Sequence, residues 1–206
     1  MPSSIILFVC FALFLSEITQ GFKVPFCRNT ISPPSNIAIL PGSGVSPSLY
    51  NELTREIEAS LPEPVSIINL NYFPLQSLPN NTLIIGHSFG GFIGLLYCLR
   101  ENLFPESQKN ISGCILINSH FNHRNKMPYP AVKMQFVPVP VLVLLNVQDE
   151  KLPLKKAMDD FEVAKEKNLT HIKFHFNVGD HTSTFTNPNE TKKAAEQIVS
   201  FLTKTT

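Results

Sequence analysis

A serine between glycines is the strongest chemical feature of this sequence. Residues 86–91 read Gly-His-Ser-Phe-Gly-Gly, and they join an apolar strand-like run directly to an apolar helix-like run. So sharp a turn strains the backbone, and Gly86 and Gly90 lack the Cβ atoms that would collide there. Ser88 is therefore expected to stand above the end of a strand, where its hydroxyl is a candidate nucleophile.

The pattern Gly-x-Ser-x-Gly between a strand and a helix resembles the nucleophile elbow of the α/β-hydrolase superfamily. The resemblance covers nearly all of the chain beyond its leader, from about Asn36 to Leu202, because further sites match in the family's order. It implies that an acid and then a histidine follow Ser88, each just beyond a later strand.

The resemblance assigns the acid to Asp149. The apolar strand in VLVLLNVQDEKLP ends shortly before Asp149, and Lys-Leu-Pro and a helical pattern follow, as at the acid position of the family. Glu150 is the neighbouring alternative, although its longer side chain and its position make it the poorer match.

His181 is the histidine that matches the family's base. It lies in NVGDHTSTF, after the last predicted strand and ahead of the terminal helix, and Asp180 beside it is interpreted as a loop residue. The other five histidines fit this role less well. His87 is expected to pack beneath the elbow, His171 and His175 to face solvent on an edge strand, and His120 and His123 to lie in a loop that precedes the acid.

Two backbone N–H groups are expected to form an oxyanion hole, which stabilises the negative oxygen of an acyl-transfer intermediate. By resemblance to the family, one belongs to Phe89, the residue after the nucleophile. The other lies in ILPGSG (39–44), which takes the place of the family's more usual His-Gly pair. Ser43 is the predicted donor there, and Gly42 is the alternative.

The rest of the chain alternates between strand-like and helix-like segments, which implies an α/β fold with a parallel sheet. The strand-like runs are apolar on both faces, as expected of strands covered by helices on both sides. The resemblance narrows the fold to a three-layer α/β-hydrolase fold with a trimmed, mostly parallel sheet of about six strands. The predicted strands are Asn36–Leu40, Val65–Leu70, Thr82–Ile85, Gly113–Asn118, Val141–Leu145 and His171–Asn177, and the stripe Leu154, Met158 and Phe161 is assigned to the apolar face of one helix.

A short insert at 119–139 takes the place of the helical cap that many α/β-hydrolases carry. It is too short and too rich in proline to form a helical domain, so the site is expected to be open. Met127, Tyr129 and Phe136 are the predicted apolar wall for an acyl chain. A solvated loop with a few buried apolar residues is the alternative.

Composition excludes several classes of protein. The chain has 206 residues, a formal net charge of +1 and 43% hydrophobic residues. A nucleic-acid-binding protein needs a basic surface to neutralise phosphates, so no nucleic-acid partner is predicted. The hydrophobic content is too high, and the charge too low, for a disordered chain.

The N-terminal segment is predicted to lie outside the catalytic domain at 36–206. Residues 1–21 resemble a secretory signal peptide, because the apolar run Ile5–Leu15 is too short to span a membrane. Residues 22–35 form a linker or a transit-like segment poor in acidic residues. The predicted destination is the secretory pathway, and an algal plastid reached by a two-part leader is the alternative.

These features predict a serine hydrolase that cleaves a carboxylic ester, including a lipid ester or thioester, through an acyl-enzyme. The mechanism needs no metal and no organic cofactor. The predicted partners are a small-molecule or lipid ester substrate and, transiently, a membrane surface. A ligand-binding protein without catalysis and an acyltransferase are the alternatives, and the oligomeric state stays open.

Overall fold

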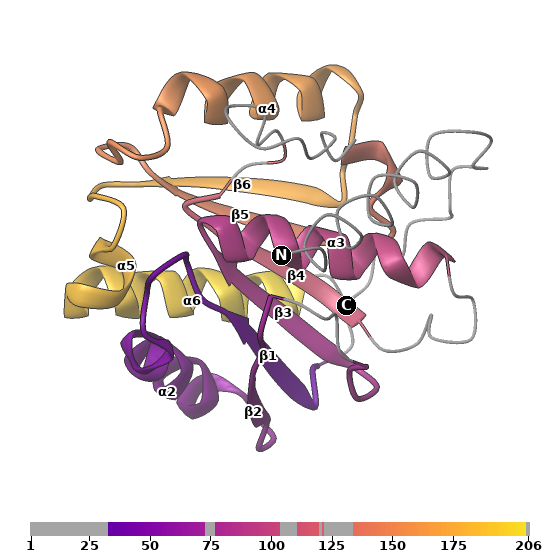
Figure 1. The fold of residues 1–206 in the computed structure, drawn as a ribbon, viewed down its shortest axis with the longest axis vertical. Coiled ribbons are helices and arrows are strands. Elements are labelled where there is room, and N and C mark those ends of the chain that lie inside the picture. Colours follow the sequence, from indigo (N-terminus) through magenta and orange to yellow (C-terminus); the bar gives the residue numbers. More distant parts are fainter. Residues whose placement is uncertain (1–32, 73–76, 104–110, 120, 122–133, 205–206) are drawn as a thin grey trace, which may run out of the picture.

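The computed structural model describes residues 33–72, 77–103, 111–119, 121 and 134–204 of the chain. Within these ranges six strands form one parallel sheet in the order β2-β1-β3-β4-β5-β6 (Figure 1). The strands are β1 (Asn36–Leu40), β2 (Ser66–Asn69), β3 (Thr82–His87), β4 (Ile111–Ile117), β5 (Val141–Asn146) and β6 (Ile172–Asn177).

In the described part of the chain, helices follow β1, β3, β4, β5 and β6, and those before β6 lie in segments that return the chain to the starting edge of the sheet. They are the 3-10 helices η1 (Pro47–Tyr50) and η3 (Met134–Phe136) and the α-helices α2 (Asn51–Ser60), α3 (Phe89–Leu103), α4 (Leu154–Glu166), α5 (Ser183–Thr186) and α6 (Pro188–Lys204).

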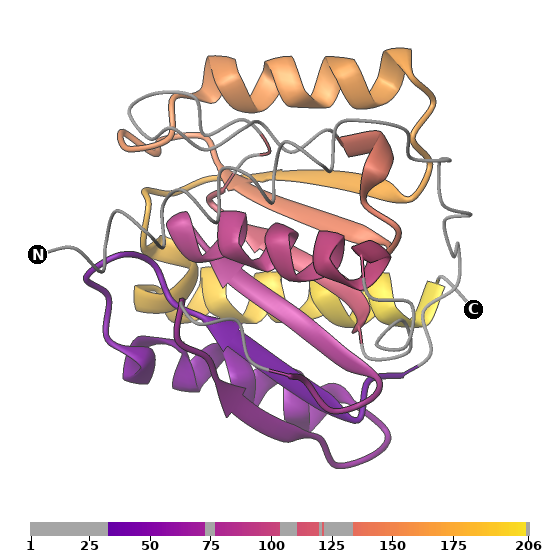
Figure 2. The same ribbon diagram turned by 45° about the vertical axis from the view of Figure 1, so that its right-hand side comes forward.

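The helices cover both faces of the sheet, and Figures 1 and 2 show α3 and α4 on one face and α2, α5 and α6 on the other. Two apolar clusters fill the two interfaces. Ile84 of β3 packs into the cluster that includes α3 and α4, while its neighbours Leu83 and Ile85 pack into the cluster with α2 and α6. Alternation of side chains along a strand produces this division. The predicted three-layer α/β fold is therefore confirmed.

The two strands β3 and β5 are buried along their whole length, which explains the run of apolar residues at 83–85 in β3 and 141–145 in β5. β2 differs, because three of its four residues are exposed and it pairs with β1 alone. It is also shorter than the predicted strand Val65–Leu70.

The apolar face predicted for α4 is wrong for Leu154 and Met158, whereas Phe161 is half-buried and its ring meets the Phe174 and Phe176 rings edge to face. Leu154 and Met158 are 39% and 36% exposed, and α4 buries Ala157, Asp160 and Ala164 instead. Bulkier residues are thus turned outward, and a carboxyl group lies on the buried face. On this face Asp160 Oδ2 accepts the Phe121 amide at 2.9 Å, so the segment at Phe121 covers the helix there.

A parallel sheet places the carboxyl ends of all its strands at one edge, and the loops that follow β1, β3, β5 and β6 meet there. These loops carry Ser43, Ser88, Asp149 and His181, respectively. The topology therefore brings together four sequence positions that are far apart in the chain.

Several predictions concern residues outside the described ranges. These are the signal peptide at 1–21, most of the segment 22–35, Met127 and Tyr129. Phe136 is the last residue of η3, and its side chain is not among those described. No helix in the described part of the chain is long and apolar enough to cross a membrane. Nor does any group of three His, Cys, Asp or Glu side chains in this part gather as a metal site would require.

Candidate active site

Ser88 lies on a sharp turn between β3 and α3. Its φ angle is +53°, a left-handed conformation that side-chain-bearing residues adopt at a cost of about 1–3 kcal/mol. A Cβ atom on Gly86 would lie 2.6 Å from the Gly90 carbonyl oxygen, and one on Gly90 would collide with the Leu40 carbonyl oxygen. Both glycines are thus required for the chain to turn this tightly. The Ser88 amide donates to the Ile117 carbonyl oxygen at 2.9 Å, which ties the turn to the end of β4.

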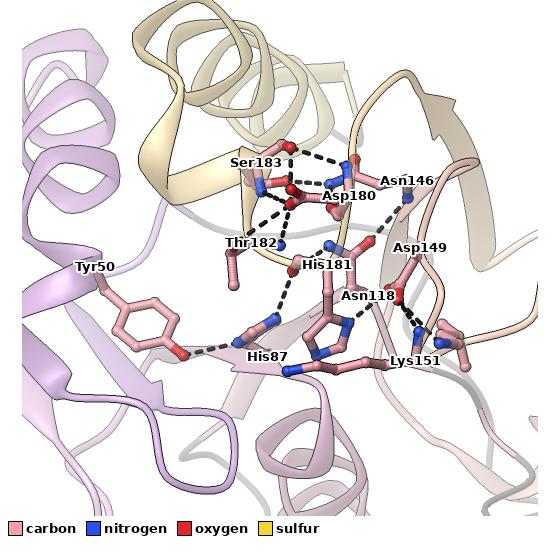
Figure 3. A network of polar contacts seen from close by, with 12 residues as sticks. Tyr50, His87, Asn118, Asn146, Asp149, Lys151, Asp180, His181, Thr182 and Ser183 are labelled. Atoms are coloured by element: carbon pink, nitrogen blue, oxygen red, sulfur yellow. Dashed lines mark hydrogen bonds and ion pairs between the residues drawn. The ribbon is translucent and has the colours of Figure 1, made fainter.

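Asp149 is a buried carboxylate with several donors around it. Its Oδ1 accepts the amides of Lys151 and Leu152 at 2.8 and 2.9 Å, and its Oδ2 lies 2.6 Å from His181 Nδ1. The residue is only 5% exposed. The turn after β5 therefore holds the carboxylate in place locally and points its second oxygen at the histidine (Figure 3).

His181 is oriented by this contact. An ionised carboxylate only accepts hydrogen bonds, so Nδ1 carries the proton and the neutral ring leaves Nε2 as an acceptor. Among the described residues, the structure gives His181 Nε2 no hydrogen-bond partner. Glu150, the alternative acid, is exposed, and Asp180 bonds to Thr182 and Ser183 of its own turn. Of the three acids considered, Asp149 is the one that contacts His181.

The loop that carries His181 is held by two asparagines that the sequence analysis did not single out. Asn118 Nδ2 donates to the His181 carbonyl oxygen at 2.8 Å, and Asn118 Oδ1 accepts the Asn146 amide at 2.8 Å. Asn146 Nδ2 then donates to the Asp180 carbonyl oxygen at 2.6 Å. Both asparagines lie at strand ends, where a polar residue after an apolar run is the signal that could have revealed them.

The loop after β1 contains the predicted oxyanion donor. The Gly42 amide donates to the Tyr50 hydroxyl at 2.8 Å, so this alternative donor already has a partner. Ser43 is exposed, and the structure gives its amide no partner within the described ranges. The Val45 amide donates to the Gly42 carbonyl oxygen at 3.0 Å and closes the turn. The geometry therefore favours Ser43 over Gly42.

Tyr72 and Phe89 lie beside this loop. The Tyr72 hydroxyl donates to the Pro41 carbonyl oxygen at 2.6 Å, and its ring meets the Phe89 ring edge to face, with centroids 5.2 Å apart. Phe89 is the first residue of α3, so its amide lies in the first turn of this helix. Tyr72 was missed by the sequence analysis because no motif includes it.

His87 lies beneath the elbow and is completely buried. Its ring centroid lies 4.7 Å from that of His181. Burial, together with the adjacent His181, lowers the pKa of the His87 imidazole to about 4. Because His87 precedes Ser88 in the chain and contacts His181, the serine turn and the histidine loop are neighbours.

The remaining histidines lie elsewhere. His175 is exposed on β6, as expected, whereas His171 is half-buried, and its Nε2 has no partner in the described part of the chain. The expectation that His171 faces solvent is therefore wrong. Its imidazole is hydrogen-bonded to the backbone of Met134, the first residue of η3, and is partly buried there. His120 and His123 fall outside the described residues.

Comparison with known proteins places the chain in a family. The family model for the alpha/beta hydrolase fold matches residues 37–174, more than half of the chain. The chain belongs to the α/β-hydrolase fold family. The matched residues include Ser88 and Asp149 and end before His181. No curated protein matches the sequence.

Solved structures agree on the fold at low sequence identity. The chain is similar to a sugar hydrolase from Lactococcus lactis at 14% identity and a TM-score of 0.60, with 87% of this chain and 92% of that one covered. A pyrethroid hydrolase from Sphingobium faniae matches at 13% identity and a TM-score of 0.54, with coverage of 82% and 97%. An esterase domain from Rhodothermus marinus matches at 14% identity and 0.52, with coverage of 84% and 89%.

Proposed function

We propose that this α/β-hydrolase is a serine hydrolase that cleaves a carboxylic ester through an acyl-enzyme. The observations that carry the proposal are the buried contact of 2.6 Å between His181 Nδ1 and Asp149 Oδ2 and a serine in a left-handed turn, whose preceding residue, His87, lies against the His181 ring. A strained backbone and an oriented histidine are both costly, and they recur together where a serine must act as a nucleophile.

In the proposed first step, Ser88 Oγ attacks the ester carbonyl carbon while His181 Nε2 takes the hydroxyl proton. Asp149 stabilises the resulting imidazolium and keeps its ring in the required orientation. The carbonyl oxygen gains negative charge as the new C–O bond forms. The Phe89 and Ser43 amides are the proposed donors to this oxygen, and removal of one such donor lowers kcat about 10²–10³-fold in a well-studied case.

In the second step, the imidazolium gives its proton to the leaving alcohol, and the tetrahedral intermediate collapses to an ester of Ser88. Water then attacks this acyl-enzyme with His181 as the base, and Ser88 regains its proton when the acid is released. Every proton in this sequence passes through His181 Nε2, which is why its orientation by Asp149 matters.

A substrate with an apolar acyl part is the finer proposal. The loops that carry Asp149 and His181 each expose a valine, Val147 at 38% and Val178 at 60%. Phe89 and Tyr72 add aromatic surface next to the serine. Met127, Tyr129 and Phe136 remain predicted contacts of the acyl chain.

The test uses the chain from Phe22 onward, incubated with a fluorophosphonate probe beside Ser88→Ala. We expect covalent labelling of the parent and none of the variant, because the probe reacts with activated serine hydroxyls. Ser66→Ala is the matched control, since it removes an exposed serine hydroxyl at the start of β2, outside the proposed site. It should label as the parent does.

A series of nitrophenyl esters from acetate to laurate then measures acyl preference, with and without an added alcohol acceptor. Release of free acid supports hydrolysis, and kcat/KM that rises with acyl length supports the apolar substrate. Transfer to the alcohol in preference to water would favour the acyltransferase. A folded parent that neither labels nor turns over any ester would overturn the proposed function and favour a binding protein.

A further inference from the structure

A continuous chain of hydrogen bonds joins the loop after β1 to the loop after β6. The Gly42 amide contacts the Tyr50 hydroxyl at 2.8 Å, this hydroxyl contacts His87 Nδ1 at 2.8 Å, and His87 Nε2 contacts the His181 carbonyl oxygen at 3.0 Å. Figure 3 shows Tyr50, His87 and the His181 backbone along this line. The two loops follow strands that are separated by three others in the sheet.

The protons in this chain can be arranged in one way while His87 is neutral. A carbonyl oxygen only accepts, so His87 Nε2 must carry the ring proton and donate it to His181. His87 Nδ1 is then an acceptor, and the Tyr50 O–H donates to it. The Tyr50 oxygen in turn accepts the Gly42 N–H, so every donor is matched with an acceptor.

Burial keeps this arrangement from changing. Tyr50 is 1% exposed and His87 is fully buried, and the Phe185 ring meets both rings edge to face at 4.6 and 4.8 Å between centroids. Burial also lowers the pKa of His87 to about 4, so the ring stays neutral at neutral pH. A Cβ atom on Gly42 would lie 2.8 Å from His87 Nδ1, so the loop rests directly on the imidazole.

We propose that Tyr50 and His87 are positioning residues. They fix the loop after β1, which carries Ser43, relative to the loop after β6, which carries His181. This inference rests on the proposed function, since it assigns Ser43 and His181 to a common transition state. Neither Tyr50 nor His87 has to touch the substrate. Their role is to hold the Ser43 amide at a fixed distance from the nucleophile and its base, because a misplacement of about 1 Å can cost 10²-fold in rate.

The first test reads the proton arrangement directly and needs no substrate. Two-bond ¹⁵N–¹H correlation spectra distinguish the two neutral tautomers of histidine and the charged ring. We expect His87 in the Nε2–H form throughout about pH 6–8, the range in which an ordinary histidine titrates. An Nδ1–H tautomer, or a charged ring in this range, would overturn the inference.

The second test removes one hydroxyl. In Tyr50→Phe the Gly42 amide and His87 Nδ1 both lose a buried partner, and we expect kcat to fall about tenfold with little change in KM. A loss confined to thermal stability, with kcat and KM as in the parent, would indicate a merely structural role and would overturn the inference.

A double-variant comparison tests whether the two residues act together. Tyr50→Phe and His87→Leu each break the chain, so their combined loss of kcat should be well below the product of the two single losses. Tyr97→Phe is the matched control, since it removes a buried tyrosine hydroxyl from the apolar cluster on the other face of the sheet from Tyr50. Its effect should multiply with that of His87→Leu.

Multiplicative losses for Tyr50→Phe and His87→Leu would overturn the inference. If His87→Leu does not fold, the tautomer of His87 and the kinetics of Tyr50→Phe still decide it. A parent that fails to label with the fluorophosphonate overturns the proposed function instead, and the tautomer measurement separates that outcome from a failure of the hydrogen-bond chain.

Discussion

Asp149 and Asp160 are equally buried carboxyl groups in very different surroundings. They are 5% and 7% exposed, respectively. Asp149 accepts three N–H groups, from Lys151, Leu152 and His181. For Asp160 the structure gives one donor among the described residues, the Phe121 amide at 2.9 Å, and burial raises the pKa of this carboxyl to about 6.

The difference teaches that burial alone does not determine what a carboxyl group can do. A buried charge is costly unless donors replace the water that it loses. The turn after β5 supplies those donors and leaves one oxygen for a histidine, whereas Asp160, on the buried face of α4, receives a single amide, that of Phe121. The first arrangement suits a catalytic acid, and the second favours a proton on the carboxyl group.

The largest expected effect follows from replacing the carboxylate of Asp149 by an amide. In Asp149→Asn the amide oxygen still accepts the Lys151 and Leu152 amides. The NH₂ group takes the place of Oδ2 and presents an N–H group to His181 Nδ1. His181 would adopt the wrong tautomer, and we expect kcat for ester hydrolysis to fall about 10⁴-fold, as at an equivalent triad elsewhere. Steady-state kinetics of the folded variant measure this.

Glu150→Gln is the matched control for that variant, because Glu150 is exposed and adjacent in sequence. It should leave kcat unchanged. If Glu150→Gln caused the large loss and Asp149→Asn did not, the assignment of the acid would have to be exchanged between the two residues.

At Asp160 the expected effect is on stability and depends on pH. Its folded pKa lies above its ordinary value of 3.8, so the folded state binds this proton more tightly and the parent loses stability as pH rises from about 4 to 6. Asp160→Asn keeps an acceptor for the Phe121 amide and cannot ionise. We expect it to unfold with about 2–3 kcal/mol more free energy than the parent at pH 7, and with little difference near pH 4.

Urea unfolding of both proteins at the two pH values measures this difference. A variant that is less stable than the parent at pH 7 would show that the Asp160 carboxylate has partners that compensate its burial. The contrast with Asp149 would then disappear.

Asp180 supplies the third case, a carboxylate with donors but without burial. It is exposed, and its Oδ1 accepts the Thr182 and Ser183 amides, both at 2.8 Å. These bonds lower its pKa, so its contribution to stability is present above the ordinary pKa and is lost as pH falls below it. Because water competes for an exposed group, we expect Asp180→Ala to cost below about 1 kcal/mol at pH 7 in the same unfolding measurement. A loss as large as that expected from breaking a buried pair would contradict this ranking.

Most of the fold was predictable from the sequence because its signals are local. The apolar runs of β3 and β5 are typical of central strands, and the structure has both at nearly the predicted bounds. The face of α4 was not predictable. Hydrophobicity assigned Leu154 and Met158 to the core, but the side of the helix that is buried depends on the segments that cover it, such as the one at Phe121, which is 39 residues from Asp160 in the chain.

The same distinction applies to the candidate site. Ser88 and Asp149 stand in short patterns of glycine, proline and apolar residues, so their positions could be predicted. Tyr50, Asn118 and Asn146 could not, since their partners lie 28 to 63 residues away in the chain and only the folded sheet brings them together. Their contacts require knowledge of strand order, which no local pattern contains.

The exposed edge strand β2 also has a consequence for motion. It has four residues, pairs with β1 alone, and is followed closely by Tyr72, whose hydroxyl holds the Pro41 carbonyl oxygen. Backbone amides at such an edge exchange with solvent through small local openings, whereas those of β3 and β4 exchange only when the domain unfolds. An opening of β2 that reached Tyr72 would release one of the two tyrosine contacts on the loop after β1. This edge strand therefore gives the loop a way to loosen on a timescale separate from that of global unfolding.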